Sequence, residues 1–411
     1  MISSPEEGRR RSTLGKWFRS GAAIFVFAFL IRLVTSWQVL HSIPIPHFWH
    51  GAEQGALAVS ILQQHVFASP YDQRQLTAWI APIYPCVVAA VFGTLGAYAL
   101  ASTYMLVGLN VLFSALTALV IYAIGKRVFG VTVGATAGWL WAFCLPDAVM
   151  PLLIWDTCLS AFLLATGFLL SLPLENSENY RRWGGVGLFW GVACLVNPAL
   201  ISPVPFLWAL SWFWEWKRER NLWRQATLSA VLLLAVLSPW LARNYRVFHT
   251  PIFVRSNFGA ELYFGNLGFE SHPLGSTMEY QKLGELPYVA QKQHAVLEYI
   301  RNNVREFAKS SLHRAVSFWI VPKISQTYWL SISLLSFTGL GLAIRKRKHE
   351  ALLFLVVMVC YPLVYYVTYI FPKYRHPIEP LMFVLAAYAL VGLARFSRLW
   401  GVRPNTARIN E

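Results

Sequence analysis

The stretch HFWHGAEQGALAVSILQQHVFASPYDQRQLTAWIAPIY, residues 47–84, follows the first apolar segment of membrane-spanning length. It contains Glu53, which apart from Asp72 is the only carboxylate between that segment and Asp147. An ionisable group at a membrane boundary costs free energy, so it indicates a functional site. We interpret Glu53 as the acidic residue of such a site and the rest of the chain as its frame.

The composition indicates a membrane protein. Hydrophobic residues make up 56% of the 411 residues and charged residues only 13%, about half of the roughly 25% that is usual in soluble proteins. The net charge of +16 does not indicate nucleic-acid binding, because the basic residues form short runs between apolar stretches. The five cysteines lie in or beside apolar segments, which predicts neither disulfides nor a metal site.

A membrane span needs about 20 mostly apolar residues. The candidate spans are 20–40, 80–97, 102–124, 131–148, 157–173, 183–197, 198–214, 226–242, 327–344, 351–371 and 377–394. If all of them cross, the basic clusters cannot all be cytoplasmic. Interpreting 80–97, which contains Pro82 and Pro85, as re-entrant places every cluster on the cytoplasmic side. We therefore predict an all-α polytopic protein with about ten crossings and both termini cytoplasmic.

The predicted parts are a transmembrane module at 1–242, an extracytoplasmic region at 243–325, and C-terminal spans with a tail at 326–411. The first half of the middle region predicts irregular structure or short strands. Its second half, from Pro287 to Trp319, predicts one amphipathic basic helix, either at the membrane surface or covering the bundle. The pair Asn197-Pro198 either separates two short spans or kinks one helix.

A further acidic cluster is expected on the outer side. Asp147 and Asp156 flank a loop there, and with Glu53 their carboxylates could bind a divalent cation or orient an acceptor. Asp156 could instead cap the helix that follows it. Glu53 could likewise be a structural residue paired with Arg74.

Late in the chain, FPKYRHPIEP at 371–380 gathers Lys373, Arg375 and His376 in a short outer turn. Cations held there against the positive-inside trend indicate a lipid-phosphate site, with ordinary headgroup contacts as the alternative.

Polar and aromatic residues alternate in RSNFGAELYFGN at 255–266. Aromatic faces stack on sugars, and amide and carboxylate groups bind hydroxyls. The expected substrate-binding residues are Arg255, Asn257, Glu261 and Asn266; a loop that only packs on the bundle is the alternative.

Four short motifs now fall into a familiar order: TAWIAPIYP (77–85), IGKRVFG (124–130), LPDAVMPLLIWDT (145–157) and KYRHPIEP (373–380). Together with the early acidic loop, this order resembles the integral-membrane glycosyltransferases that use polyprenyl-phosphate sugars. They have the GT-C fold, and the closest group is that of the protein mannosyltransferases and aminoarabinose transferases. Tyr84, in the first motif, is a further candidate for substrate binding.

The resemblance implies specific roles. In that family an Asp-Glu pair opens the first outer loop and supplies the catalytic base; here Glu53 matches the Glu and Ala52 stands at the Asp position. Asp156 matches the aspartate of the second loop. Arg375 matches the late arginine that meets the carrier phosphate, with Lys373 beside it.

The implied reaction is an inverting transfer of a hexosyl or pentosyl group to a hydroxyl group of a protein, lipid or glycan. The donor is a polyprenyl-phosphate sugar that enters from the outer leaflet. Acidic and basic residues that often precede the re-entrant proline in the family are Ile80 and Ala81 here, so no metal site is assigned and a divalent cation stays open as a cofactor. The absence of an Asn-x-Ser/Thr sequon favours a bacterial inner membrane.

Two other function classes are weighed. A transporter or flippase for a lipid-linked saccharide would place ionisable residues near mid-span, whereas Arg32 is the only charge well inside a predicted span. A non-catalytic scaffold in envelope assembly is left open by Ala52.

Overall fold

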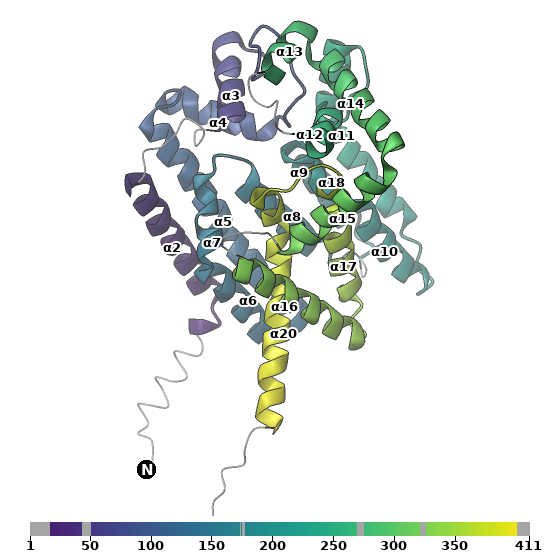
Figure 1. The fold of residues 1–411 in the computed structure, drawn as a ribbon. Coiled ribbons are helices and arrows are strands. Elements are labelled where there is room, and N and C mark those ends of the chain that lie inside the picture. The colour runs from purple at the N-terminus through teal and green to yellow at the C-terminus, as the bar shows by residue number, and fades with distance from the viewer. Residues whose placement is uncertain are drawn as a thin grey trace, which may run out of the picture.

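The computed structural model describes residues 17–42, 51–172, 174, 177–268, 275–320 and 326–400. These residues form helices and connecting loops, and their only β pairing is a single bridge between Ala68 and Leu76 (Figure 1). The predicted all-α membrane architecture is confirmed. The helices are α2 (Gly21–Ser42), α3 (Ala52–Gln64), α4 (Ile83–Leu95), α5 (Leu100–Phe129), α6 (Val131–Phe143), α7 (Leu145–Ala148), η2 (Met150–Leu152), α8 (Thr157–Ser171), α9 (Tyr180–Val196), η4 (Pro198–Ile201), α10 (Val204–Trp216), α11 (Trp223–Phe248), α12 (Phe258–Leu267), α13 (Gly275–Leu283), α14 (Glu285–Asn302), α15 (Val304–Ile320), α16 (Gln326–Arg345), α17 (Glu350–Cys360), α18 (Leu363–Val367), α19 (Pro372–Arg375), η5 (His376–Ile378) and α20 (Glu379–Trp400).

Several of these helices are long and apolar enough to cross a membrane. Among the described residues there are six: α2, α5, α11, Tyr328–Arg345, Glu350–Val367 and Pro372–Ala394. The bent pair formed by α6 and Leu145–Leu152 makes seven if it is one span, and α4 and α8 are shorter apolar helices. The number of ten crossings and the re-entrant path of 80–97 stay predictions.

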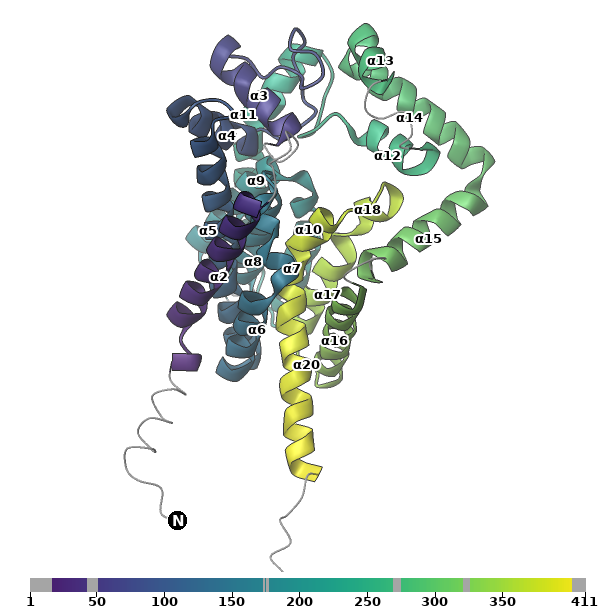
Figure 2. The ribbon, with the colours of Figure 1, turned by 60° about the vertical axis from the view of Figure 1, so that its left-hand side comes forward.

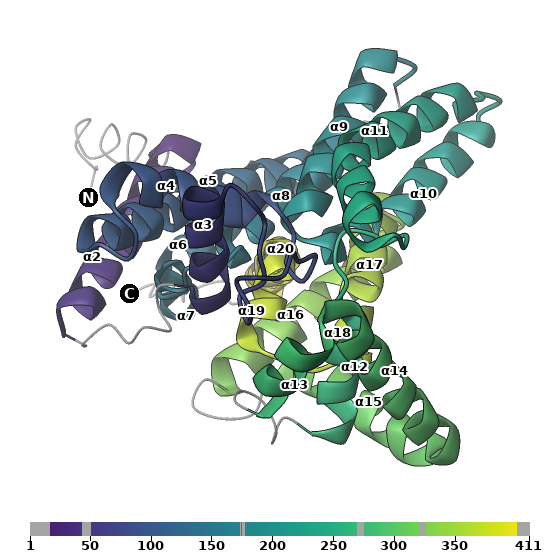
Figure 3. The ribbon, with the colours of Figure 1, turned by 90° about the horizontal axis from the view of Figure 1, so that it is seen from above.

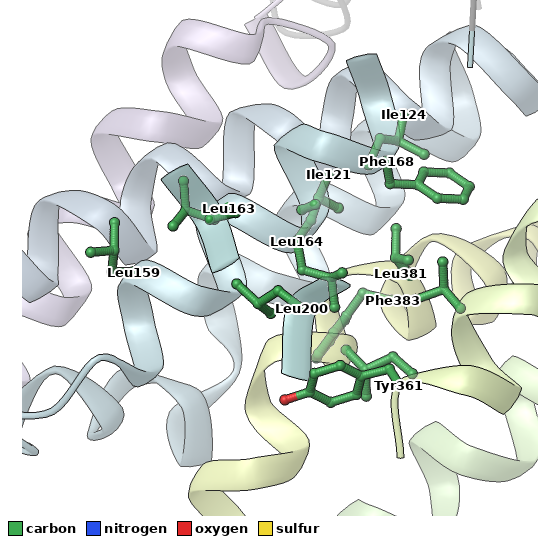
Figure 4. Packing of buried hydrophobic residues seen from close by; sticks show 14 of the residues in the cluster. Ile121, Ile124, Leu159, Leu163, Leu164, Phe168, Leu200, Tyr361, Leu381 and Phe383 are labelled. Carbon is green, nitrogen blue, oxygen red and sulfur yellow. The ribbon is translucent and has the colours of Figure 1, made fainter. Parts of the chain in front are cut away.

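The bundle is organised around α5. This helix packs against α2, α6 and α8, while α20 packs against α16 and α6. Their contact faces are aliphatic and aromatic, as the close-up of the core shows (Figure 4). In a bilayer lipid tails are as apolar as these side chains, so close packing rather than exclusion of water holds the helices together.

Arg32 of α2 explains how α6 can end inside the bundle. The α6–α7 pair bends by 63° at Cys144, which frees the last carbonyl groups of α6. The buried Arg32 guanidinium donates to the carbonyl oxygens of Trp141 (3.0 Å) and Ala142 (3.3 Å), and to Ser114 Oγ (2.6 Å). The one charge inside the first span therefore satisfies the backbone of a broken helix.

A second layer covers one end of the bundle. α3, α13 and α14 lie at the end opposite the C-terminal turns of α20 (Figures 1 and 2). Seen from above, α19 lies between α3 and α12 (Figure 3). The predicted outer face therefore brings together segments from the beginning, middle and end of the chain.

Two predictions for the middle region were wrong. Residues 258–267, expected to be irregular or in strands, form helix α12. The single helix expected from Pro287 to Trp319 is two helices, α14 and α15, that meet at Asn303. Asn303 leaves the helical conformation (φ −133°, ψ 44°), and its side chain bonds to the Tyr299 carbonyl oxygen, as expected of a residue that competes for local backbone groups.

The Asn197-Pro198 pair separates two elements rather than kinking one. Asn197 is extended (φ −151°, ψ 112°) and ends α9, and Pro198 begins η4. The residue before a proline is disfavoured in the α conformation, and Asn197 Oδ1 accepts a hydrogen bond from the Ala199 N–H. The break directs the Asn197 amide toward the site described next.

Candidate active site

Lys373 lies at the centre of a group of charges on the predicted outer face. Its Nζ atom is 3.9 Å from the centroid of the Trp155 ring and 5.2 Å from that of Tyr374. The carboxylates of Glu53, Asp156 and Glu261 all interact with it electrostatically, yet none of the described carboxylates forms an ion pair with it. The ammonium group is therefore held by aromatic rings, and its charge remains available to a ligand.

Glu53 lies in the first turn of α3, and its carboxylate interacts electrostatically with Lys373. Gly51 lies two residues before Glu53 and has a φ of 67°. A Cβ atom added at Gly51 would lie 2.6 Å from the Ile154 carbonyl oxygen, so both the conformation and the space exclude other residues there. The Glu53 carboxylate accepts a hydrogen bond from the Tyr71 hydroxyl. Burial, and then the negative charge of Glu53, raise the pKa of Tyr71, so the phenol stays a donor. Glu53 is not paired with Arg74, which forms its ion pair with Asp72 (2.9 Å).

Asp156 occupies the N-cap position of α8 but makes no capping hydrogen bond with its side chain. Instead its Oδ2 accepts hydrogen bonds from Ser160 Oγ (2.9 Å) and Asn197 Nδ2 (3.0 Å). Burial raises the pKa of Asp156 even though Ser160, Arg255 and Lys373 oppose the shift. The Asp156 side chain is thus oriented by Ser160 of α8 and by Asn197 at the end of α9, and it does not cap α8.

Arg255 and Glu261 form the opposite wall. Arg255 Nε donates to the Trp79 carbonyl oxygen (2.9 Å), and a terminal nitrogen lies 3.9 Å from Glu261 Oε1. Glu261 also accepts hydrogen bonds from Asn257 Nδ2 (2.6 Å) and from the Tyr369 hydroxyl. Burial raises the pKa of Glu261. Burial lowers the pKa of Arg255, but the negative charges around it, that of Glu261 first, together outweigh burial and raise its pKa overall.

Two other expected residues lie elsewhere. Asn266 Nδ2 donates to the Val367 carbonyl oxygen (2.9 Å), and its Oδ1 accepts from Arg314 (2.8 Å), so its side chain joins α12 to α18 and α15. Tyr84 is buried in the core with its hydroxyl 3.5 Å from Asn110 Oδ1. Both have structural contacts rather than a place beside Lys373.

Arg375, two residues after Lys373, is completely buried. Its guanidinium donates to the carbonyl oxygens of Trp319 (3.0 Å) and Trp329 (3.3 Å), and its Nε lies 3.2 Å from Glu379 Oε1. It therefore satisfies a carbonyl group at the end of α15, much as Arg32 does for α6, and also contacts the first turn of α16.

His376 belongs to the same buried network. Its Nδ1 lies 3.2 Å from Asp147 Oδ1 and 3.1 Å from Glu379 Oε2, and Asp147 also accepts from the Tyr328 hydroxyl (3.0 Å). Asp147 and Asp156 were expected to face Glu53 together, and they do not. Asp147 points into the bundle from the one-turn helix α7, whereas Asp156 follows η2.

Asp147, His376 and Glu379 are the described group whose metal-binding atoms lie within 4.8 Å of one another. Carboxylate and imidazole suit zinc. The charges do not: Arg375 and Arg32 already interact with these two carboxylates, so a divalent ion would leave two excess positive charges in an apolar interior, at a cost of several kcal/mol. The group fits a metal by ligand type but not by charge, and we derive no step from it.

Sequence reasoning missed several residues of the site. Tyr71, Trp155 and Tyr369 contact the predicted charges, and Asn197 orients Asp156. Trp155 is next to Asp156 in the chain, and Tyr71 is 18 residues from Glu53 in the same stretch, so these two could have been found from their position. Tyr369 and Asn197 are 108 and 41 residues from the carboxylates that they contact.

Comparison with known proteins finds a family model that matches part of the chain and solved structures of one fold. Residues 104–242 match the family model described as dolichyl-phosphate-mannose-protein mannosyltransferase. The structure is similar to the oligosaccharyltransferase AglB from Archaeoglobus fulgidus in complex with an inhibitory peptide and a dolichol-phosphate, with a TM-score of 0.56 and 13% identity over 94% of this chain and 52% of that one. The chain has the GT-C fold.

A second GT-C structure agrees. ArnT from Cupriavidus metallidurans, bound to undecaprenyl phosphate, matches with a TM-score of 0.55 and 14% identity over 93% of this chain and 66% of that one. AglB was also solved in complex with Zn and sulfate (TM-score 0.57, 12% identity, 91% of this chain and 50% of that one). The chain thus spans about half the length of the archaeal enzyme. No curated protein matches the sequence. The resemblance drawn from the sequence to polyprenyl-phosphate-dependent membrane glycosyltransferases is confirmed.

Proposed function

We propose that this GT-C chain transfers a sugar from a polyprenyl-phosphate carrier to an acceptor hydroxyl on the outer face of a membrane, with inversion. The observation that supports this best is the meeting of Lys373 and Arg255 with Glu53, Asp156 and Glu261 in one group. The match to a mannosyltransferase family and the carrier lipids bound in AglB and ArnT support the same chemistry.

Lys373 and Arg255 are the proposed phosphate-binding residues. Lys373 forms no ion pair with the described residues, and Arg255 lies 3.9 Å from its carboxylate, longer than a hydrogen bond. Phosphate oxygens could therefore accept hydrogen bonds from both the Lys373 ammonium and the Arg255 guanidinium. Arg375, with its donors directed at main-chain carbonyl groups, and His376 act as positioning residues that fix α19.

Glu53 is the proposed base. It removes the proton from the acceptor hydroxyl, whose oxygen attacks the anomeric carbon opposite the phosphate. The bond from that carbon to the phosphate oxygen breaks, and the phosphate leaves with the electron pair, so the configuration inverts. Lys373 and Arg255 stabilise the charge that develops on it. The hydrogen bond from Tyr71 orients Glu53, and Asp156, Asn257 and Glu261 are placed to bind sugar or acceptor hydroxyls.

The wider assignment is proposed on the same basis. It comprises catalytic spans at 1–242, an outer region at 243–325, C-terminal spans at 326–411, and a bacterial inner-membrane location with both termini cytoplasmic. Hexosyl and pentosyl donors and protein, lipid or glycan acceptors are all compatible with the group. The transporter alternative is less well supported, because Arg32 is engaged with the backbone of α6 rather than with a pathway.

The test uses the full chain in proteoliposomes with short-chain polyprenyl-phosphate sugars that differ in the sugar. Release of carrier phosphate is measured with and without a chelator, and the product's anomeric configuration is determined. Glu53→Gln should lower kcat by about 10²–10⁴-fold, the usual contribution of a general base, and Lys373→Met should also impair transfer. Glu298→Gln, at an exposed position on α14, is the matched control. Full activity of Glu53→Gln and Lys373→Met would refute the proposal.

A further inference from the structure

A groove of about 810 Å³, with Lys373 not among its lining residues, lies on the side of the bundle where the described chain begins. Its walls are α6, α16 and α20, and residues 18–19 close one end. The lining is almost entirely apolar, with Thr132 and Thr136 as the polar residues along α6. Phe143 and Leu145 at the other end are 56% and 66% exposed, so the groove opens sideways toward lipid.

Arg19 lies at the polar end, and the fold holds it there. Its carbonyl oxygen accepts a hydrogen bond from the Tyr122 hydroxyl (3.0 Å), and the preceding carbonyl, of Phe18, accepts one from Trp139 Nε1 (2.8 Å). The guanidinium is exposed and makes no ion pair with the described residues. The main chain of Arg19 is thus held at the end of an apolar groove, and its cation is not paired with any of the described carboxylates.

The dimensions suit one acyl chain. From Thr132 to Phe143 the α6 wall is about 17 Å long at 1.5 Å per residue. One leaflet contributes roughly 15 Å of hydrocarbon, half of the bilayer core. We propose that this groove binds a diacyl phospholipid with an anionic headgroup, with its phosphate on Arg19 and one chain along α6. The site is independent of the proposed sugar transfer.

The experiment uses the delipidated full chain in detergent, titrated with phosphatidylglycerol or phosphatidylcholine and followed by native mass spectrometry. We expect phosphatidylglycerol to bind at least several-fold more tightly. Arg19→Gln should weaken its binding by about tenfold, equivalent to about 1.4 kcal/mol, and Thr136→Trp should block the groove. Arg127→Gln, an exposed arginine near the end of α5, should bind like the unchanged protein.

Several outcomes would overturn the proposal. They are equal binding of the two lipids, equal losses in Arg19→Gln and Arg127→Gln, and unchanged binding in Thr136→Trp. A third titration with polyprenyl phosphate distinguishes the carrier lipid: if it alone binds in an Arg19-dependent manner, the groove is a carrier site and not a phospholipid site. Thermal melting of each variant without lipid separates misfolding from loss of binding.

Discussion

The Lys373 ammonium lies 3.9 Å from the centroid of the Trp155 indole ring, and Trp155 directly precedes Asp156 in the chain. A cation over an aromatic face is stabilised by about 0.5–2 kcal/mol. Unlike a carboxylate, the ring does not neutralise the cation. The arrangement therefore places the ammonium group near Asp156 and leaves it able to bind an incoming anion.

Replacing Trp155 with Leu should weaken donor binding more than it slows chemistry. Loss of the ring removes about 1–2 kcal/mol of the interaction that holds the Lys373 ammonium in place. KM for the polyprenyl-phosphate sugar should therefore rise by roughly tenfold, with a smaller change in kcat. The KM of Trp155→Phe, which keeps an aromatic face, should lie between that of the unchanged protein and that of Trp155→Leu. An unchanged KM in Trp155→Leu would show that the contact does not position Lys373.

Asp156 should make stability depend on pH in a direction opposite to that of an ordinary ion-paired carboxylate. Burial raises its pKa above 3.8 in the folded protein. Between 3.8 and the raised value the folded state binds more protons than the unfolded state, so stability falls as pH rises through that window. Asp156→Asn should therefore melt at a higher temperature at neutral pH, with a flatter profile between about pH 4 and pH 7.

Asp72 is the matched control for this profile. The hydrogen bond from Arg74 lowers its pKa below 3.8, so its stabilisation is complete above 3.8 and is lost only as pH falls through the lower value. Asp72→Asn should lower the melting temperature by a similar amount throughout the same range. If Asp156→Asn also lowers the melting temperature throughout this range, the pKa of Asp156 is not raised in the folded protein.

The sequence was sufficient for the fold class because apolar runs of membrane length are a strong signal. It also placed Glu53, Asp156 and Lys373 on one face, and the structure brings these three together. It could not separate Lys373 from Arg375. On a helical turn, residues two apart are rotated by about 200° about the axis and so point to nearly opposite sides, and that turn, α19, is too short to predict.

The middle region shows a different limit. The apolar positions from Val296 to Phe307 keep a helical spacing across Asn303, so periodicity alone does not reveal that α14 and α15 are separate. The break between α14 and α15 depends on the long-range contacts that α15 makes. Its Arg314 donates to the Tyr366 and Gly265 carbonyl oxygens (2.8 and 2.7 Å), and such long-range contacts leave no local pattern.

Arg32 should be essential for folding and not for chemistry. Arg32→Met leaves the Trp141 and Ala142 carbonyl groups without their donor, and each buried unsatisfied group costs about 1–3 kcal/mol. The variant should give a low yield of monodisperse protein and a lower melting temperature in detergent. Arg32→Lys keeps the charge but has fewer donors, so it should be intermediate. A fully stable Arg32→Met would mean that α6 does not depend on this contact.

Gly339 and Gly341 of α16 provide a paired test of helix packing. A Cβ at Gly339 would lie 2.0 Å from the Leu385 carbonyl oxygen of α20, whereas one at Gly341 would meet nothing within 4 Å. Gly339→Ala must push the two helices apart, which should destabilise the protein by about 1–3 kcal/mol. Gly341→Ala should be neutral or stabilising by up to about 1 kcal/mol, since alanine favours the helix. Thermal melting of both variants in the same detergent decides the matter, and equal melting temperatures would contradict the close approach of α16 to α20.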